Sequence, residues 1–146
     1  MDPLSISAGI LTLLHAANKI IHFTSSAKGA TSAISALLAE MKSLRNMLES
    51  IYQVLASSDS PETIPATGLD EIAALCNSED GPIIKELNSL QEILRLPDWA
   101  GQDGSRRKAL IYSLTWPLKE GDTKKILERI VRLKQDLQLV LAAKNS

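Results

Sequence analysis

The chain has 146 residues and a formal net charge of −1, which suits one domain and excludes the strongly basic balance typical of general nucleic-acid-binding proteins. Aromatic residues make up only 3% of the chain, and most of the apolar 45% is Leu, Ile and Ala. Leu and Ala lose little side-chain freedom in a helix, so this composition favours helices over sheets. We therefore expect a single helical domain over residues 1–146.

The first 23 residues are almost free of charge. Between Pro3 and Phe23 the only charged side chain is Lys19, and Asp2-Pro3 reads as a cap followed by the first helical turn. We expect a helix over about 3–25, and its stretch from Pro3 to Phe23 alone would be about 30 Å long, near the thickness of the hydrocarbon core of a bilayer. Such a helix, apolar on most sides but diluted by Ser and Thr, belongs either at the centre of a bundle or in lipid, and both interpretations stay open.

Apolar spacing predicts the remaining helices in chain order. The strongest stripe, from Ile34 to Leu55, indicates a helix over about 30–57. A loop through Gly68 precedes a short helix, and Asp80-Gly-Pro82 reads as a cap and first turn of the next helix. Trp116-Pro117 separates the last two helices and is expected to anchor the core or a hinge, whereas Trp99 could cap the bundle or lie at an interface. These further helices are expected at about 69–77, 81–95, 105–116 and 122–143. The fold class is all-α, a four- to five-helix up-and-down bundle.

Catalytic and cofactor signatures are missing from the chain. It has no glycine-rich phosphate loop, no nucleophile elbow and no metal-ligand spacing, so we expect no enzyme activity, cofactor or metal centre. His15 and His22 share a helix face without a neighbouring carboxylate, which favours partly buried or interfacial histidines over metal ligands. Cys76 is the only cysteine, so an intramolecular disulfide is excluded, and it is expected to be a small buried residue.

Charge is divided unevenly along the chain. Residues 1–95 carry 6 Lys and Arg against 11 Asp and Glu, whereas residues 96–146 carry 10 against 6. Either the acidic part packs on the basic part, or the basic part presents a face to anionic lipid or a protein partner.

Three blocks of sequence resemble one family. Met1-Asp-Pro-Leu-Ser-Ile-Ser-Ala-Gly-Ile10 is similar to the opening of the fungal HeLo-like N-terminal domains of STAND (NLR-like) receptors. Asp80-Gly-Pro82 resembles the family pattern before the third long helix. Leu114-Thr-Trp-Pro-Leu-Lys-Glu-Gly-Asp122, followed by Ile126-Leu-Glu-Arg-Ile130, resembles its Trp-Pro-apolar-Lys-Glu block and final helix. The likeness runs over essentially the whole chain.

The resemblance implies a bundle related to the HeLo domain of HET-S and to the four-helix bundle of the mixed-lineage-kinase-like necroptosis executor. By that likeness the chain is a cell-death effector of fungal heterokaryon incompatibility or innate immunity. It is latent in the cytoplasm until an upstream NLR or amyloid-signalling protein assembles, then self-associates and permeabilises the plasma membrane. Nucleic acid is not an expected partner. The alternative is a signalling or oligomerisation adaptor of a STAND receptor without direct membrane activity.

Two groups of residues would act at the membrane on the first interpretation. The insertion group lies on the first helix and comprises Leu4, Ile6, Gly9, Ile10, Leu11, Leu13, Leu14, Ile20 and Ile21. The group expected to contact anionic lipid comprises Arg106, Arg107, Lys108, Lys124, Lys125, Arg129 and Arg132.

Overall fold

The structure, a computed structural model, describes residues 3–26, 31–56, 66–94 and 116–143. Within these ranges the secondary structure is helical and no strand occurs, which confirms the all-α class. The helices are α1 (Pro3–Ser26), α2 (Ser32–Ala56), α3 (Ala66–Leu75), α4 (Pro82–Ile93) and α6 (Glu120–Ala143). The helix expected at about 105–116 lies outside the described residues.

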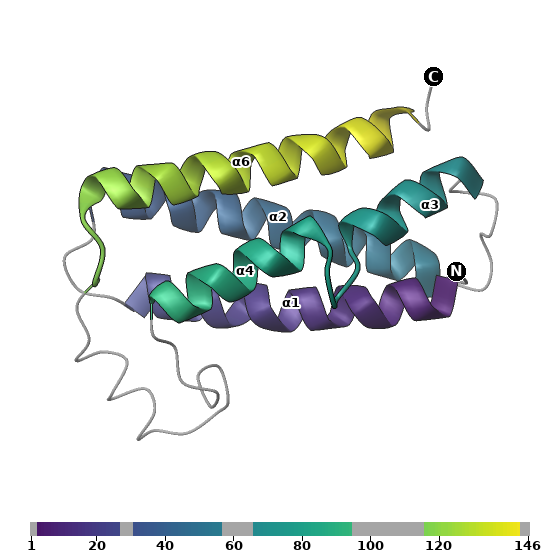
Figure 1. The fold of residues 1–146 in the computed structure, drawn as a ribbon, viewed down its shortest axis with the longest axis horizontal. Helices are drawn as coiled ribbons and strands as arrows, with labels where there is room; N and C mark the ends of the chain where they lie inside the picture. The colour runs from purple at the N-terminus through teal and green to yellow at the C-terminus, as the bar shows by residue number, and fades with distance from the viewer. Residues whose placement is uncertain (1–2, 27–30, 57–65, 95–115, 144–146) are drawn as a thin grey trace.

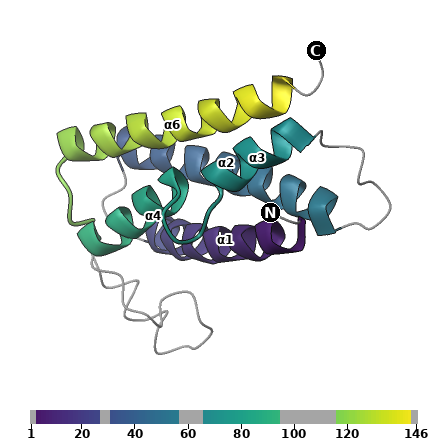
Figure 2. The same cartoon turned by 45° about the vertical axis from the view of Figure 1, so that its right-hand side comes forward.

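The described helices form an up-and-down bundle with four corners. α1, α2 and α6 each fill one corner, and α3 and α4, which follow one another nearly in line, share the fourth (Figures 1 and 2). α1 packs against α2, α4 and α3, while α6 packs against α2, α3 and α4. α1 runs antiparallel to its neighbour α2, and α6 runs antiparallel to α3 and α4, whereas the neighbours α2 and α6 run parallel (Figure 1). α1 begins and α6 ends at the same end of the bundle (Figure 1).

A single cluster of buried side chains joins the helices. α2 contributes its periodic stripe, and α6 contributes Ile126, Ile130 and Leu137. α1 contributes to this cluster from its start to its end, from Ile6 to Phe23. The spacing of apolar residues therefore predicted correctly which face of α2 turns inward.

The turn between α3 and α4 is tight and is built by Asn77 and Gly81. The Asn77 side-chain oxygen accepts hydrogen bonds from the backbone N–H groups of Glu79 (2.8 Å) and Asp80 (3.3 Å). The N-cap of α4 is Gly81, with no side-chain cap, and Pro82 lies in the first turn as expected. The expectation that Asp80 caps this helix is therefore wrong, because the turn places the one residue without a side chain at the cap.

Trp116 fastens the start of α6 to the end of α1. Its ring lies 6.0 Å from the ring of Phe23, centroid to centroid, and its Nε1–H donates to the Thr123 hydroxyl at 2.9 Å. The same hydroxyl donates to the Lys119 carbonyl at 3.0 Å, so Thr123 is buried with its polar groups satisfied. This confirms Trp116 as an anchor, while Trp99 lies outside the described residues.

Helix ends differ from the expected ones by a few residues. α2 begins at Ser32 because the Thr31 hydroxyl accepts a hydrogen bond from the Ile34 N–H at 3.3 Å, as an N-cap does. α3 begins at Ala66, so the segment up to Gly68 is helix and not the expected loop. One glycine costs a helix only about 1 kcal/mol, which tertiary packing overrides.

We predict that Gly81→Ala destabilises the bundle by about 1–3 kcal/mol. A Cβ at this position would lie 2.7 Å from the Asn77 carbonyl oxygen and 3.0 Å from that of Ala74, both of them backbone atoms that cannot move cheaply. The matched control is Gly121→Ala in α6, where nothing lies within 4 Å of the added Cβ. There, stability should stay equal or rise by up to about 1 kcal/mol, from helix propensity. Urea unfolding of both variants measures the contrast, and equal effects would contradict this account of the turn.

Candidate functional site

The inward face of α1 holds most of the residues predicted for membrane insertion. Gly9 is half-buried, Leu11 is 48% exposed, and the Leu4 side chain lies outside the described part of the structure. The others are fully or almost fully buried against neighbouring helices, namely Ile6, Ile10, Leu13, Leu14, Ile20 and Ile21. In this conformation these side chains are therefore core residues, and lipid can reach them only if α1 exchanges its partners.

Gly9 serves a close contact inside the bundle. A Cβ on Gly9 would lie 3.1 Å from the carbonyl oxygen of Cys76, so the missing side chain lets the turn between α3 and α4 approach α1. Cys76 itself is buried, as expected, and burial raises the pKa of its thiol to about 12. The thiol is thus protonated and unreactive at neutral pH while this contact persists.

The outward face of α1 is polar but nearly uncharged. It consists of Ser5, Ala8, Leu11, Thr12, His15, Asn18, Lys19, His22 and Ser25. Lys19 is its only Lys, Arg, Asp or Glu, and α1 as a whole, 24 residues long, has no other. By contrast α6, also 24 residues long, carries nine such residues, and α2 carries four.

Length and composition make α1 the only candidate span among the described residues. The segment Ser5–Ser26 is long and apolar enough to cross a bilayer, although 61% of its most apolar window is buried inside the bundle. A core helix of a soluble protein meets the same criterion, so this finding alone does not separate the two interpretations.

The predicted lipid-contacting residues of α6 are exposed but do not form a purely basic face. Lys124, Lys125, Arg129 and Arg132 are all exposed. Helical spacing places Glu128 three or four residues from three of these four basic side chains, so acidic groups alternate with them. Arg106, Arg107 and Lys108 lie outside the described residues, and the prediction of lipid contact remains a prediction.

Two ion pairs join α6 to the acidic part of the chain. Arg129 lies 3.6 Å from Glu86 of α4 and has a side chain that is 56% exposed. Lys134 pairs with Glu40 of α2 where both side chains are mostly buried. At least in part, therefore, the basic residues pack against the acidic ones, as the first of the two sequence interpretations expects.

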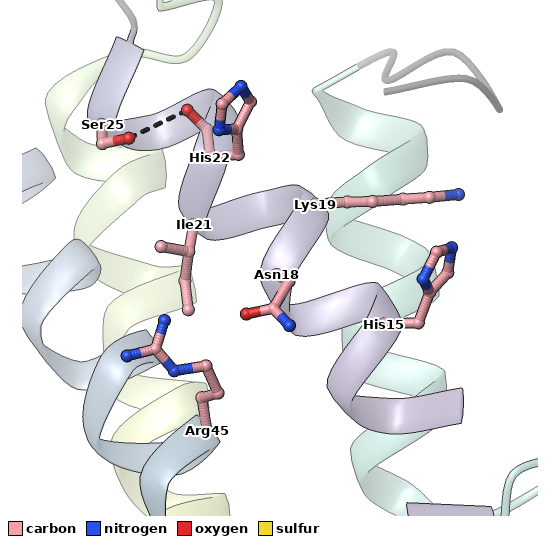
Figure 3. A pocket seen from close by; sticks show the side chains of 7 residues that line it. All are labelled: His15, Asn18, Lys19, Ile21, His22, Ser25 and Arg45. Carbon is pink, nitrogen blue, oxygen red and sulfur yellow. Dashed lines mark hydrogen bonds between the residues drawn. The ribbon is translucent and has the colours of Figure 1, made fainter. Parts of the chain in front are cut away.

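A hollow of about 290 Å³ opens between α1 and α2. It is lined by His15, Asn18, Lys19, Ile21, His22, Ser25 and Arg45. Figure 3 shows Asn18 and the Arg45 guanidinium on the α2 side of α1, whereas His15 and Lys19 extend away from α2. Sequence reasoning did not single out Arg45, because its place outside the apolar stripe of α2 says nothing about which helix lies beside it.

His15 and His22 do not belong to a cluster of side chains that could bind a metal ion. They lie on one helix face with no carboxylate or thiol among the residues that line the hollow. Among the described residues no group of three or more His, Cys, Asp and Glu side chains could hold a metal ion.

Comparisons of the chain with models of protein families, with curated proteins and with solved structures found no match.

We predict that the two faces of α1 respond differently to truncation. Leu13→Ala should lower the free energy of unfolding by about 2–5 kcal/mol, because Leu13 is fully buried and its loss leaves a cavity. Leu11→Ala removes the same atoms from a half-exposed site and should cost less than about 1 kcal/mol. Urea denaturation followed by circular dichroism gives both values. Comparable losses would show that α1 is not oriented as described.

Proposed function

We propose that this chain is a HeLo-like cell-death effector domain that is latent as a soluble bundle and permeabilises the plasma membrane through α1. Activation brings several copies together on an upstream NLR or amyloid-signalling protein, and α1 then exchanges its contacts within the bundle for lipid and neighbouring copies. The chain acts without catalysis or a cofactor.

The observation that carries this proposal is the lack of charge on the outward face of α1. Burial in a bundle explains an apolar inward face, but it places no such demand on residues that face water. The outward sides of α2 and α6 carry exposed charges such as Lys42, Glu49 and Lys125, as expected for a soluble domain. A helix that must also enter lipid has to avoid charge on every side, and α1 does so except at Lys19.

The dimensions of α1 suit a bilayer. Its 24 residues give a length of about 36 Å, against about 30 Å for the hydrocarbon core. Lys19 lies about two turns before the C-terminal end of the helix, and its long flexible side chain can extend from there toward the headgroups. Serine, threonine and asparagine, which carry no charge, are among the other polar residues of the outward face.

The free energy of burial requires α1 to give up its contacts in the bundle and gain new ones in a single concerted step. The six buried Leu and Ile residues of the insertion group contribute on the order of 9–18 kcal/mol, at about 1.5–3 kcal/mol for each side chain. That is comparable with the total stability of a typical domain, about 5–15 kcal/mol. Release of α1 into water therefore amounts to unfolding, and only a new apolar environment can replace what α1 loses.

Self-association supplies a place for the polar side chains once α1 leaves the bundle. In lipid the wide apolar face of α1 would turn outward, and the stripe from Thr12 through His15 to His22 would face other copies or water. A single copy would leave these groups unsatisfied in hydrocarbon, which favours an assembly over a lone helix. The exposed lysines and arginines of α6 would assist by attraction to anionic headgroups.

We predict that Ala8→Glu abolishes the release of a trapped dye from anionic vesicles. Ala8 is exposed on α1, so the substitution leaves the core of the latent bundle intact, but it places a second charge in the inserted helix, on a side chain shorter than that of lysine. The cost is up to about 2.5–3.5 kcal/mol, the value for a charge at the bilayer centre. Ala39→Glu is the matched control, because Ala39 is equally an exposed alanine on the outward side of a helix, α2. It should release dye like the wild type.

Two results would contradict the proposal. One is the absence of dye release by the wild-type chain under conditions in which it binds the vesicles. The other is equal dye release by wild type, Ala8→Glu and Ala39→Glu. Substitutions at Ile10 or Leu14 are less informative, because both side chains are buried and a charge there would unfold the latent bundle.

The burial of α1 favours a second candidate function, that of an adaptor domain. If α1 is only a core helix, the bundle acts by presenting a surface to another protein, and α6 offers Leu139, which is 69% exposed on its outer side. An adaptor would recruit its partner without changing the vesicles. Dye release therefore separates the two functions directly.

A further inference from the structure

We propose that the hollow between α1 and α2 binds a phosphate group, with Arg45 as its anchor. Four of the seven lining residues carry basic nitrogen atoms: His15, Lys19, His22 and Arg45. None of the seven is acidic. This inference concerns the latent bundle and holds whether or not α1 enters a bilayer.

Arg45 lacks the partners that a half-buried guanidinium normally has. Its Nε–H is buried without a hydrogen-bond partner, and its only hydrogen bond among the described residues is a long one of 3.4 Å to the Asn46 side chain. The ion pairs within the described residues involve Arg129 and Lys134, not Arg45. A buried donor without an acceptor is costly, so a shift of the Arg45 side chain that brings its Nε–H to an acceptor from outside the chain would be favourable.

The chemistry of the lining residues favours phosphate over a carboxylate. A guanidinium offers a planar pair of N–H donors that matches two phosphate oxygens, and the Asn18 amide lies on the same side of α1 (Figure 3). Lys19 lines the same hollow and adds positive charge, although its side chain extends away from α2 (Figure 3). A phosphate monoester carries about −1.5 to −2 charges at neutral pH and so gains more from this surrounding charge than a single carboxylate does.

The direct test is a titration of the full chain with inorganic pyrophosphate, followed by NMR signals of the Arg45 Nε–H and the Asn18 side-chain amide. Both signals should shift and saturate, and sodium chloride at equal ionic strength should not reproduce the shifts. Arg45→Gln should weaken binding by roughly tenfold or more, and Arg45→Lys, which keeps the charge but loses the fork, should weaken it less. Lys42→Gln is the matched control, because Lys42 lies exposed on α2 outside the hollow and its loss changes the net charge equally.

Vesicle binding distinguishes the source of the phosphate. Phosphatidylcholine vesicles that contain phosphatidic acid are compared with vesicles of equal charge that contain phosphatidylserine. An Arg45-dependent preference for phosphatidic acid would identify a lipid headgroup, and Arg45-dependent binding of pyrophosphate alone would identify a soluble phosphate compound. Either result supports the site.

Three results would overturn the inference. These are the absence of saturable Arg45-dependent binding to either probe, an equal loss of affinity in Lys42→Gln, and a lower melting temperature of Arg45→Gln that accounts for its weaker binding. The expected melting temperature of Arg45→Gln is unchanged or higher, because the substitution removes a buried donor that has no partner. Failure of this test would leave the dye-release result untouched, since that result depends on Ala8 and not on Arg45.

Discussion

The packing of α1 among α2, α3 and α4 is the interaction on which the rest of the bundle depends. α1 supplies buried side chains along its whole length, and Phe23 at its end holds Trp116 and through it the start of α6. The turn between α3 and α4 packs against Gly9. Loss of α1 would therefore expose α2, the turn between α3 and α4, and the start of α6 together. We therefore expect no stable form of the domain that merely lacks this helix.

This dependence constrains any membrane mechanism. A peripheral helix could swing out while its domain stayed folded, but a central helix can leave only if the remaining helices also find new partners. On the proposed mechanism, crowding of several copies at a membrane would supply such partners, because the apolar face exposed on one copy could pack on that of the next. The same dependence would keep an isolated copy latent, since release of α1 into water would expose the core.

The sequence predicted the helices well where one face differs clearly from the other. The stripe of α2 from Ile34 to Leu55 is buried as its spacing predicted, because a period near 3.6 defines a single inward side. α1 is apolar over too wide an arc for its inward side to be read from spacing, and the division between Leu11 and Leu13 emerges only from the positions of its neighbours. The cap at Gly81 was missed for a similar reason: Asp80 has the usual side chain of a cap, but backbone atoms of Ala74 and Asn77 leave room only for glycine at the position that the turn provides.

The candidate sites divide along the same line. The lack of charge on α1 is visible in the sequence, whereas the hollow around Arg45 needs two helices to be placed side by side. The basic residues of α6 are a site that the sequence overstated. Counted over residues 96–146 they suggest a basic region, whereas on the helix acidic side chains lie among them.

The reactivity of Cys76 tests the central claim, that α1 leaves its place in the bundle when membranes are permeabilised. Cys76 is the only cysteine, lies against Gly9 of α1, and has a buried thiol with its pKa raised to about 12. In solution its alkylation should be at least about a thousandfold slower than in the unfolded chain, as the stability of a folded domain requires. On vesicles that release dye the rate should rise toward the unfolded value, while Ala8→Glu on the same vesicles stays protected. Dye release with Cys76 as protected as it is in solution would contradict the account.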